Sequence, residues 1–455
     1  MATRLPANSR TESRRRFLKR AAAAVGVLGV PMVVSPSVLG GEGAVAPSER
    51  VVLGCIGLGI QGQGNMRTFR GNNEVRVVAV CDVHETQRNQ AKQSVDDFYH
   101  NKDCATYVDF RELLARKDID AVQITTPDHW HPLVAIEAIR QHKHIYCEKP
   151  IGWSVRAGQA LLKAVRLSGG VVFQFGTQQR SDGKFRLACE LVRNGRIGQL
   201  KTILVGVPGS WTYPAQPTEP VPKELDYDFW LGPAPWAPYC YQRCRPYTVK
   251  DGWSVWYSIS DYCLGMIGNW GVHHLDNAQW GNNTELSGPV EITGTGVFPK
   301  GMLTDNATNW QVENRFANGV TLIHMDDHTS AKHPLQAGGH GHGVMFLGSE
   351  GWVHVDRGRL DAEPKTLLKS VIGPNEIHLF ESNNHHANFI DAIKGRSKVA
   401  APIEIAVRTD TLCHLQQLAI MLQRKLQWNP VQEAFIGDEQ ANRLLDRPMR
   451  APWRL

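Results

Sequence analysis

Residues 51–62, which read VVLGCIGLGIQG, decide the fold of this chain. The apolar run Val51–Ile56 is typical of a buried strand, and it leads directly into a G-x-G-x-x-G turn before a helical stretch that begins near Gln63. In such a turn the first glycine permits the tight bend, the second lets the backbone approach a pyrophosphate, and the third lets the helix pack closely. The helix N-terminus then favours the phosphates of a dinucleotide. The cofactor contacts predicted from this turn are Gly57, Gly59, Ile60, Gln61 and Gly62.

A carboxylate at the end of the next strand indicates which dinucleotide binds. The second apolar run, Val75–Cys81, ends at Asp82, which lies 25 residues after Gly57. A carboxylate at this point is placed to accept hydrogen bonds from the hydroxyls of the adenosine ribose. It would repel the additional phosphate of NADP, so the sequence predicts NAD, with NADP as the less favoured cofactor.

Strand-like and helix-like segments alternate through the N-terminal half and then give way to a β-rich pattern. The alternation predicts a doubly wound parallel sheet, with strands at residues 121–125, 144–147 and 171–175 and a helix at 132–141. Later apolar runs with few helices between them predict a second, α+β domain with a large and mostly antiparallel sheet, and these runs are 202–207, 290–297, 319–325 and 344–355. A helical pattern returns at 402–425. We therefore predict a Rossmann domain over residues 47–175 and a substrate and oligomerisation domain over 176–455.

Composition narrows the class of protein. The chain has 455 residues, of which 42% are hydrophobic and 21% are charged, as is ordinary for a globular protein of two domains. Its net charge of +6 is concentrated at the N-terminus, because residues 1–46 hold seven basic and two acidic residues. The remaining chain has 43 basic against 42 acidic residues. This near-neutral body removes the main electrostatic argument for nucleic-acid binding.

The first 46 residues are predicted to be an export signal. Ser13-Arg14-Arg15-Arg16-Phe17-Leu18-Lys19 precedes a moderately apolar stretch, residues 21–34, as in a twin-arginine signal. The stretch is short and contains Pro31, so we do not expect it to span a membrane. The sequence thus predicts a periplasmic or otherwise exported protein that uses the twin-arginine translocation machinery. In that compartment Cys240 and Cys244 have the opportunity to form a disulfide, and the sequence leaves this pairing open.

Polar motifs follow the later strands of the predicted parallel sheet, where ligands of such sheets bind. Thr126–His131 reads T-P-D-H-W-H, and Glu148-Lys149-Pro150 follows the next strand. A third motif, Asn269–Asp276, reads N-W-G-V-H-H-L-D. With the glycine turn, these motifs in this order resemble the Gfo/Idh/MocA family, which is named for glucose–fructose oxidoreductase, inositol dehydrogenase and a rhizopine-catabolism protein. The likeness covers nearly the whole chain after the predicted signal.

The resemblance implies roles for individual residues. Lys149 matches the active-site lysine beside the nicotinamide, and His273 matches the catalytic histidine. Either group suits the chemistry, because a hydride leaves a carbinol carbon only when its hydroxyl proton also departs to a base. The remaining cofactor contacts that the resemblance implies are Thr126, Pro127, Trp130, His131, Glu148 and Lys149.

One position departs from the family pattern. The family has aspartate at the first position of the third motif, where this chain has Asn269. Asparagine can hydrogen-bond a sugar hydroxyl or Lys149, but it supplies neither negative charge nor a base. We still assign Asn269 to the catalytic group with Lys149 and His273.

Substrate contacts are predicted around an aromatic stretch. Residues 208–262 hold seven of the ten tyrosines and five of the thirteen tryptophans, which suit stacking on sugar rings or, equally, a subunit interface. The predicted substrate-binding residues are Lys149, Arg180, Trp256, Asn269, His273 and Asp276. No metal site is predicted.

Three functions remain open from the sequence. The first is an exported NAD(P)-dependent oxidoreductase that acts on a secondary hydroxyl of a sugar or polyol, either by exchanging its cofactor or by retaining and recycling it. The second is an NAD-dependent glycosidase or lyase that oxidises the sugar transiently. The third is a non-catalytic protein that binds the cofactor or a sugar. Scarcity of free NAD outside the cytoplasm favours retention, and a homo-oligomer is expected.

Overall fold

The computed structural model describes residues 45–246, 254–336 and 339–455. Met1–Arg50 forms one unit, in which the short helix η2 (Pro47–Glu49) is described, and Val51–Leu455 forms a second, compact unit that holds both sheets. The predicted export signal therefore falls almost entirely outside the described residues. Tyr247 and Trp253 of the aromatic stretch also lie outside them.

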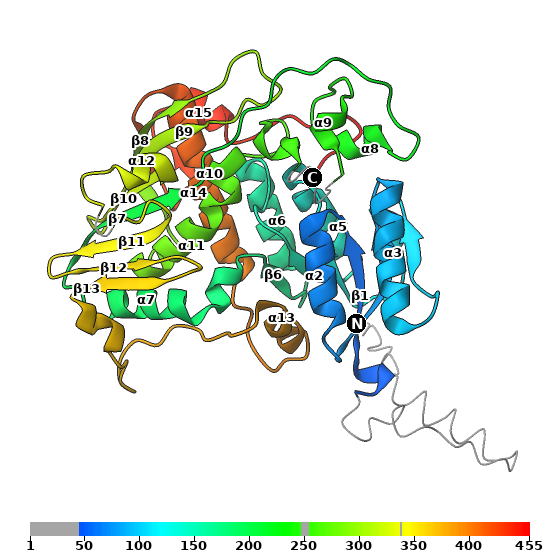
Figure 1. Ribbon diagram of the computed structural model, residues 1–455, viewed down its shortest axis with the longest axis horizontal. Coiled ribbons are helices and arrows are strands. Elements are labelled where there is room, and N and C mark those ends of the chain that lie inside the picture. Colours follow the sequence, from blue (N-terminus) through cyan, green and yellow to red (C-terminus); the bar gives the residue numbers. More distant parts are fainter. Residues whose placement is uncertain (1–44, 247–253, 337–338) are drawn as a thin grey trace, which may run out of the picture. The chain divides into compact units, whose positions relative to one another are not determined.

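The first sheet has six parallel strands in the order β3-β2-β1-β4-β5-β6, which is the order of a Rossmann fold (Figure 1). Its strands are β1 (Val51–Ile56), β2 (Val75–Cys81), β3 (Ala105–Tyr107), β4 (Ala121–Ile124), β5 (His144–Cys147) and β6 (Phe173–Phe175). Its helices are α2 (Ile60–Arg70), α3 (Glu85–Tyr99), α4 (Phe110–Leu114), α5 (His131–Arg140) and α6 (Val155–Leu167), with the short helix η3 (Asp128–Trp130) before α5. Strand β1 pairs with both β2 and β4, so the strand order reverses beside it and a crevice opens at the carboxyl ends of β1 and β4.

The second sheet has nine strands in the order β13-β12-β11-β7-β10-β9-β8-β14-β15. Only β7 and β10 pair in parallel, and the other neighbours are antiparallel. Its strands are β7 (Leu200–Val207), β8 (Pro289–Val297), β9 (Asn309–Phe316), β10 (Thr321–Asp326), β11 (Gly343–Gly348), β12 (Trp352–Val355), β13 (Leu360–Glu363), β14 (Leu426–Asn429) and β15 (Ala434–Phe435). The remaining elements are η4 (Gln178–Ser181), α7 (Gly183–Arg193), α8 (Tyr227–Leu231), α9 (Tyr241–Cys244), η5 (Val255–Ser258), α10 (Gly265–Asn269), α11 (Gly271–Asn282), α12 (Asp327–Ala331), η6 (Lys365–Lys369), α13 (His385–Ile393), α14 (Ile403–Leu422) and α15 (Glu439–Arg443).

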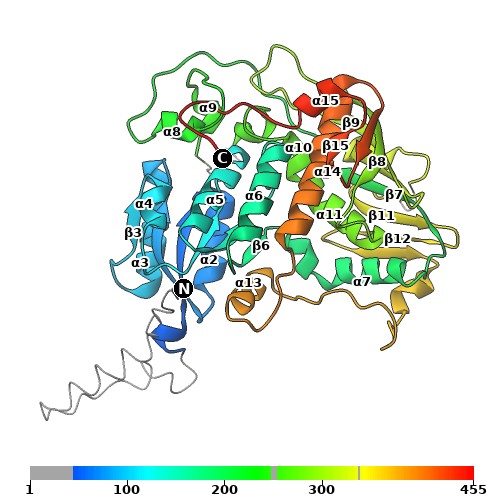
Figure 2. The ribbon, with the colours of Figure 1, turned by 180° about the vertical axis from the view of Figure 1, so that it is seen from behind.

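Helix α14 joins the two halves of the unit. It packs against α6 of the Rossmann half on one side and against α11 and β8 of the second half on the other (Figures 1 and 2). Because both sides are covered, its apolar residues are not confined to one stripe, and Leu412, Leu415 and Ile420 are all buried. Helix α11 lies next to α14 and α10, so the third sequence motif is held against the same interface.

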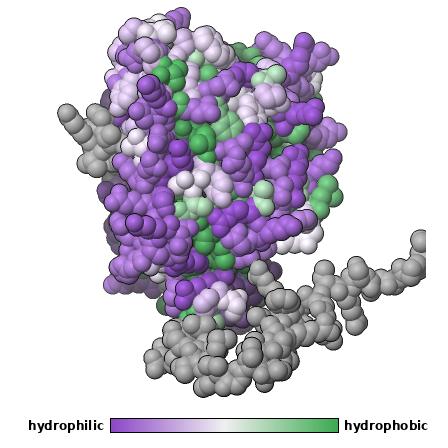
Figure 3. Space-filling model, turned by 90° about the vertical axis from the view of Figure 1, so that its right-hand side faces the viewer, coloured by the Kyte–Doolittle hydropathy of each residue, from purple (hydrophilic) through white to green (hydrophobic). Residues whose placement is uncertain are grey.

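The side of the Rossmann half that carries α3 is mostly polar (Figure 3). Figure 3 shows the side on which α3 lies in Figure 1, and on it hydrophilic residues predominate while hydrophobic residues form small groups between them. Within the described ranges, no helix combines the length and the apolar character needed to cross a membrane.

The predicted fold class is confirmed, and the local differences have simple causes. The predicted bounds of β1, β2 and β5 match the structure. The single run predicted at 344–355 is wrong, because it is a hairpin of β11 and β12 in which the Gly348 N–H donates to the Gly351 carbonyl oxygen across 2.8 Å. Strand β9 was not predicted, since its polar residues alternate with buried Trp310, Val312 and Phe316.

Candidate active site

Three glycines shape the turn between β1 and α2. Gly57 has φ +82°, and a Cβ there would lie 2.5 Å from the backbone of Thr125 and Thr126. A Cβ on Gly62 would lie 2.0 Å from the Gly57 carbonyl oxygen. At Gly59, by contrast, no atom lies within 4 Å of a built Cβ. The first and third glycines are thus required for packing, whereas the second leaves open space on the side from which phosphates would approach.

The start of α2 and Asp82 complete a site that fits a dinucleotide. No side chain caps the N-terminus of α2, so its first N–H groups are available to an anion. The Asp82 carboxylate accepts hydrogen bonds from the backbone N–H groups of Leu58 (2.7 Å) and His84 (2.8 Å). Burial raises the pKa of Asp82, and these two N–H groups oppose that rise. Asp82 therefore fixes the glycine turn and still lines the cavity where a ribose would lie.

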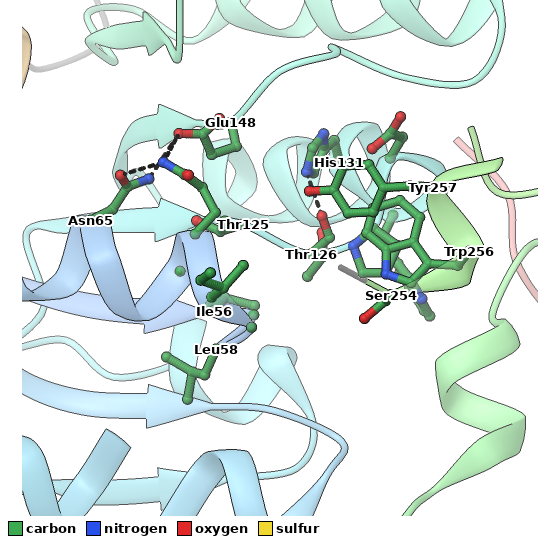
Figure 4. Close-up of a pocket in the computed structure, with 18 of the residues that line it drawn as sticks. Ile56, Leu58, Asn65, Thr125, Thr126, His131, Glu148, Ser254, Trp256 and Tyr257 are labelled. Carbon is green, nitrogen blue, oxygen red and sulfur yellow. Dashed lines mark hydrogen bonds between the residues drawn. The ribbon is translucent and has the colours of Figure 1, made fainter. Parts of the chain in front are cut away.

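One cavity of about 710 Å³ runs from the glycine turn to the second half of the unit. This volume is typical of cofactor and small-molecule sites. Figure 4 shows Ile56, Leu58, Asn65 and Thr125 on one side of it, with Trp256 and Tyr257 facing them. The predicted site residues that line it are Gly57, Gly59, Ile60, Gln61, Gly62, Asp82, Thr126, Pro127, Trp130, His131, Glu148, Lys149, Trp256, Asn269 and His273.

Lys149 lies where the two halves meet. Its Nζ donates to Oδ1 of Asn269 across 3.0 Å, which links the E-K-P motif after β5 to the end of α10. Burial lowers the pKa of Lys149, and the carboxylates of Glu148 and Asp128 oppose that shift. A lysine with a lowered pKa loses its proton more easily, and its neutral amine is a candidate base for a hydroxyl proton.

Glu148 does not orient the Lys149 ammonium group. Its Oε1 accepts hydrogen bonds from the side-chain amides of Asn65 (2.9 Å), Gln178 (2.9 Å) and Gln61 (3.3 Å). Its Oε2 accepts from the backbone N–H of Lys149 across 3.2 Å. This buried carboxylate therefore holds the loop after β5 against α2.

His131 and Trp130 position loops in addition to lining the cavity. The His131 ring nitrogens lie 2.8 Å from the Thr126 carbonyl oxygen and 2.6 Å from that of Pro150, so the ring joins the loops after β4 and β5 (Figure 4). The Trp130 indole N–H donates to the Trp230 carbonyl oxygen across 3.1 Å, and its ring packs edge-on against Trp453.

His273 projects from the first turns of α11 and is only 4% exposed. No residue in the described part of the chain hydrogen-bonds its Nδ1. Burial lowers its pKa well below the usual range, and the positive charges of Lys149 and Arg357 lower it further. The imidazole is therefore neutral at neutral pH and has a free lone pair to accept a proton.

Arg180 and Asp276, both predicted to bind substrate, bind each other instead. The guanidinium forms two hydrogen bonds to the Asp276 carboxylate, of 2.6 and 2.8 Å, and a salt bridge of 2.8 Å to Glu285. Neither Arg180 nor Asp276 lines the cavity, and both are almost completely buried. The pair links η4 to α11, so we do not retain these two residues as substrate contacts.

The structure adds residues that the sequence did not single out. Asp128, Gln178, Gln179, Trp270 and Arg357 all line the cavity. The Arg357 guanidinium lies 4.5 Å above the Trp270 ring. Asp128 could have been predicted from the sequence, because it belongs to the T-P-D-H-W-H motif. Arg357 follows β12, and nothing in its local sequence indicates a role in the site.

Two other expectations concern metals and thiols. Cys240 and Cys244 are both buried free thiols in this structure, so the disulfide left open by the sequence is not formed. Across the described ranges, no group of three or more His, Cys, Asp and Glu side chains is arranged to hold a metal ion.

Two family models match the chain. One, described as the NAD-binding Rossmann fold of an oxidoreductase family, matches residues 51–176. The other, described as the C-terminal alpha/beta domain of that oxidoreductase family, matches residues 210–455. The chain belongs to the Gfo/Idh/MocA family of NAD(P)-dependent oxidoreductases.

Curated relatives match part of this family member. Inositol 2-dehydrogenase of Salmonella typhimurium is 30% identical over 148 residues, which are 32% of this chain and 42% of that protein. A glycosyl hydrolase family 109 protein of Saccharopolyspora erythraea is 30% identical over 207 residues, 41% of this chain and 44% of that protein. The chain thus matches less than half the length of these relatives.

Solved structures share the fold over most of the chain. The WlbA dehydrogenase of Bordetella pertussis, in complex with NADH and UDP-GlcNAcA, has a TM-score of 0.59 at 16% identity and covers 84% of this chain and 99% of its own. The scyllo-inositol dehydrogenase of Lactobacillus casei, with bound NAD(H) and scyllo-inositol, has a TM-score of 0.55 at 17% identity and covers 83% and 99%. At this identity the likeness shows the fold alone.

The three glycines give a direct test of the cofactor turn. Gly59→Ala places a methyl group in open space, so we expect normal stability with NAD affinity reduced at least tenfold. Gly62→Ala forces a methyl group against the Gly57 carbonyl oxygen, and should therefore lower the melting temperature. Thermal unfolding and calorimetric titration with NAD measure the two effects. Equal NAD affinity for Gly59→Ala and the unmodified protein would contradict the assignment of the phosphate site.

Proposed function

We propose that this protein is an exported oxidoreductase that acts on a secondary hydroxyl of a sugar or polyol with a retained and recycled NAD. The observation that carries the proposal is that Lys149 and His273, two titratable groups, line the same cavity as the glycine turn and Asp82. Similarity to an inositol dehydrogenase supports a polyhydroxylated substrate. Bound NAD would supply a hydride acceptor next to the substrate carbon.

The chain's own residues have distinct tasks in this proposal. The glycine turn and the start of α2 would hold the phosphates, and Asp82 would bind the ribose hydroxyls and favour NAD over NADP. Lys149, oriented by Asn269, takes the hydroxyl proton. Trp256 and Trp270 offer apolar faces to a sugar ring. Arg357, in contact with the Trp270 ring, adds donors for substrate oxygens.

A cover over the ribose end supports cofactor retention. The cover segment, residues 219–246, includes α8 and α9 and lies against the loop that follows Asp82 (Figures 1 and 2). The backbone N–H of Glu85 donates to the Glu224 carbonyl oxygen across 2.8 Å, and that of Asp226 donates to Val83 across 3.2 Å. A dinucleotide bound beneath these hydrogen bonds would be released only after the cover moved.

The C-terminal tail strengthens this cover. The Arg450 side chain donates to the Gly232 carbonyl oxygen across 3.0 Å and forms a salt bridge of 2.5 Å with Asp228. The Trp453 ring stacks on Phe229 and packs against Trp130. The tail therefore ties the cover segment to the Rossmann half, and slow cofactor release suits an enzyme in a compartment with little free NAD.

A glycosidase or lyase that uses transient oxidation is the second candidate. Simple dehydrogenation needs one base, whereas elimination from an oxidised sugar needs a second base to remove a proton from carbon. Two candidate bases, Lys149 and His273, line the cavity, and this observation favours the second function. Similarity to glycosyl hydrolase family 109 proteins supports it. A homo-oligomer and a twin-arginine partner stay predictions for either function.

The proposal is tested first on the purified protein. We expect denaturation to release NAD or its reduced form in nearly equimolar amount. Addition of the correct sugar or glycoside to the folded protein should reduce the bound cofactor, as read from nicotinamide absorbance. A protein that contains no cofactor and binds added NAD weakly would contradict retention. Products from a glycoside, without net reduction, would select the second candidate.

Lys149 and His273 are tested by substitution. Lys149→Met keeps most of the stem volume without the charge, and His273→Asn keeps polarity without the titratable base. General acid–base groups contribute about 10²–10⁴-fold in rate, so each variant should reduce its bound cofactor more slowly by that order while retaining NAD. Stopped-flow absorbance measures the rate. Normal rates in both variants would contradict the assigned roles, and joint loss of NAD would indicate structural ones.

Export is tested on the N-terminal arginines. We expect Arg14→Lys combined with Arg15→Lys to leave a folded protein in the cytoplasm, because the twin-arginine route requires the pair. Cell fractionation and thermal unfolding measure location and stability. Export of the double variant at the normal level through this route would contradict the signal assignment.

A further inference from the structure

We propose that Arg357 binds a carboxylate of the substrate, so that the site selects sugar acids over neutral sugars. The inference rests on the proposed function, since it names the class of sugar whose hydroxyl would be oxidised. Arg357 lines the cavity together with Trp270 and His273. It is also an exposed residue, so a ligand that enters the cavity can reach its guanidinium group.

Hydrogen bonds hold the backbone of Arg357 in place. The residue lies in the turn that joins β12 to β13, where Oδ1 of Asp356 accepts hydrogen bonds from the backbone N–H groups of Gly358 (2.6 Å) and Arg359 (2.8 Å). From α7, the Lys184 Nζ donates to the Arg357 carbonyl oxygen across 2.7 Å. The side chain therefore starts from a fixed point beside the cavity.

Two uncharged neighbours direct the guanidinium group. Its central carbon lies 4.5 Å from the centre of the Trp270 ring. The Gln179 amide satisfies both of its polar atoms when its nitrogen donates to the His273 carbonyl oxygen across 3.0 Å and its oxygen accepts from Arg357 Nε across 3.3 Å. Neither neighbour accepts a hydrogen bond from the two terminal nitrogens. These can therefore hold a carboxylate in a bidentate pair.

The carboxylates nearest in effect to Arg357 are engaged elsewhere. The two whose charge acts on it are those of Glu148 and Asp182. Glu148 accepts hydrogen bonds from side-chain amides. Asp182 accepts from the backbone N–H of Lys184 across 2.8 Å and forms a salt bridge of 3.7 Å with the same residue. Neither forms a salt bridge with Arg357, so a ligand carboxylate would supply its ion-pair partner.

Charge is distributed unevenly around the cavity. Residues 208–455 contribute Arg245 and Arg357 to its described lining, and they contribute no aspartate or glutamate to it. The carboxylates of the described lining come from earlier in the chain, and they are Asp82, Asp128, Glu148 and Asp182. An anionic group is therefore favoured on the side of the cavity to which Arg357 belongs.

A carboxylate bound by Arg357 would both orient the sugar and assist its oxidation. The Trp270 ring that contacts Arg357 has its centre 5.8 Å from that of the His273 ring, so the acid group would bind close to this candidate base. The positive charge of Arg357 contributes to the lowered pKa of His273. A bound anion would offset that charge, and the imidazole would become a stronger base.

Binding to the protein as purified, with its cofactor, tests the proposal. The matched ligands are glucuronate with glucose, galacturonate with galactose, and gluconate with glucitol, each titrated by calorimetry at low ionic strength. We expect at least one acid to bind about tenfold more tightly than its neutral partner, because hydrogen bonds to charged groups add affinity. Added salt should weaken this preference. Glucose-6-phosphate tests whether a phosphate ester is bound in place of a carboxylate.

Three variants assign the preference to one side chain. Arg357→Gln removes the charge and should abolish the preference for the acid, with NAD content and melting temperature unchanged. Arg357→Lys keeps the charge without the planar fork and should retain only part of the preference. Arg359→Gln, in the same turn but outside the described lining of the cavity, is the matched control and should retain all of it. If Arg357→Gln does not fold, Arg357→Met serves in its place.

The outcomes separate the interpretations. Equal affinity for acids and neutral sugars in the unmodified protein, or binding of no acid at all, would overturn the proposal. An unchanged preference in Arg357→Gln would also overturn it, and loss of NAD from that variant would assign Arg357 to the cofactor instead. Tighter binding of glucose-6-phosphate than of every acid would overturn the choice of a carboxylate. If acids bind through Arg357 but no sugar or glycoside reduces the cofactor, the binding site stands and the proposed function fails.

Discussion

The close approach of three backbone segments at Gly57 is the constraint on which the rest of the structure depends. A side chain there would lie 2.5 Å from the backbone after β4, and a side chain at Gly62 would strike Gly57 itself. Only without both can β1, α2 and β4 meet at the point where the strand order reverses. Because the strands of this sheet are parallel, Asp82, Thr125 and Glu148 then reach one edge, where they border a single cavity.

The second half of the unit contributes polar side chains to the cavity, which make it a candidate active site. Asn269 and His273 come from α10 and α11, which α14 holds against the Rossmann half. A hydrogen bond from Lys149 to Asn269 connects the two halves inside this cavity. Arg180 and Asp276 contribute indirectly, since their buried ion pair joins η4 to α11 and so fixes the helix that carries His273.

Asn269 places an uncharged amide beside the Lys149 ammonium group. The amide oxygen orients the ammonium group but does not take its proton. Asp128, after the neighbouring strand β4, is another buried carboxylate that lines the cavity.

The sequence by itself determined the Rossmann half and its cofactor turn, because those features depend on local periodicity and on glycines at fixed spacing. It also pointed to Lys149, Asn269 and His273, which line the cavity, through motifs in a fixed order along the chain. The tertiary structure alone decided that Arg180 pairs with Asp276, that Glu148 binds side-chain amides and not the Lys149 ammonium group, and that Arg357 reaches the cavity. Each of these outcomes depends on contacts between residues far apart in sequence. The local sequence around Arg180 and Asp276 does not indicate whether these side chains face a cavity or each other. Their pairing depends on how α11 packs against α14.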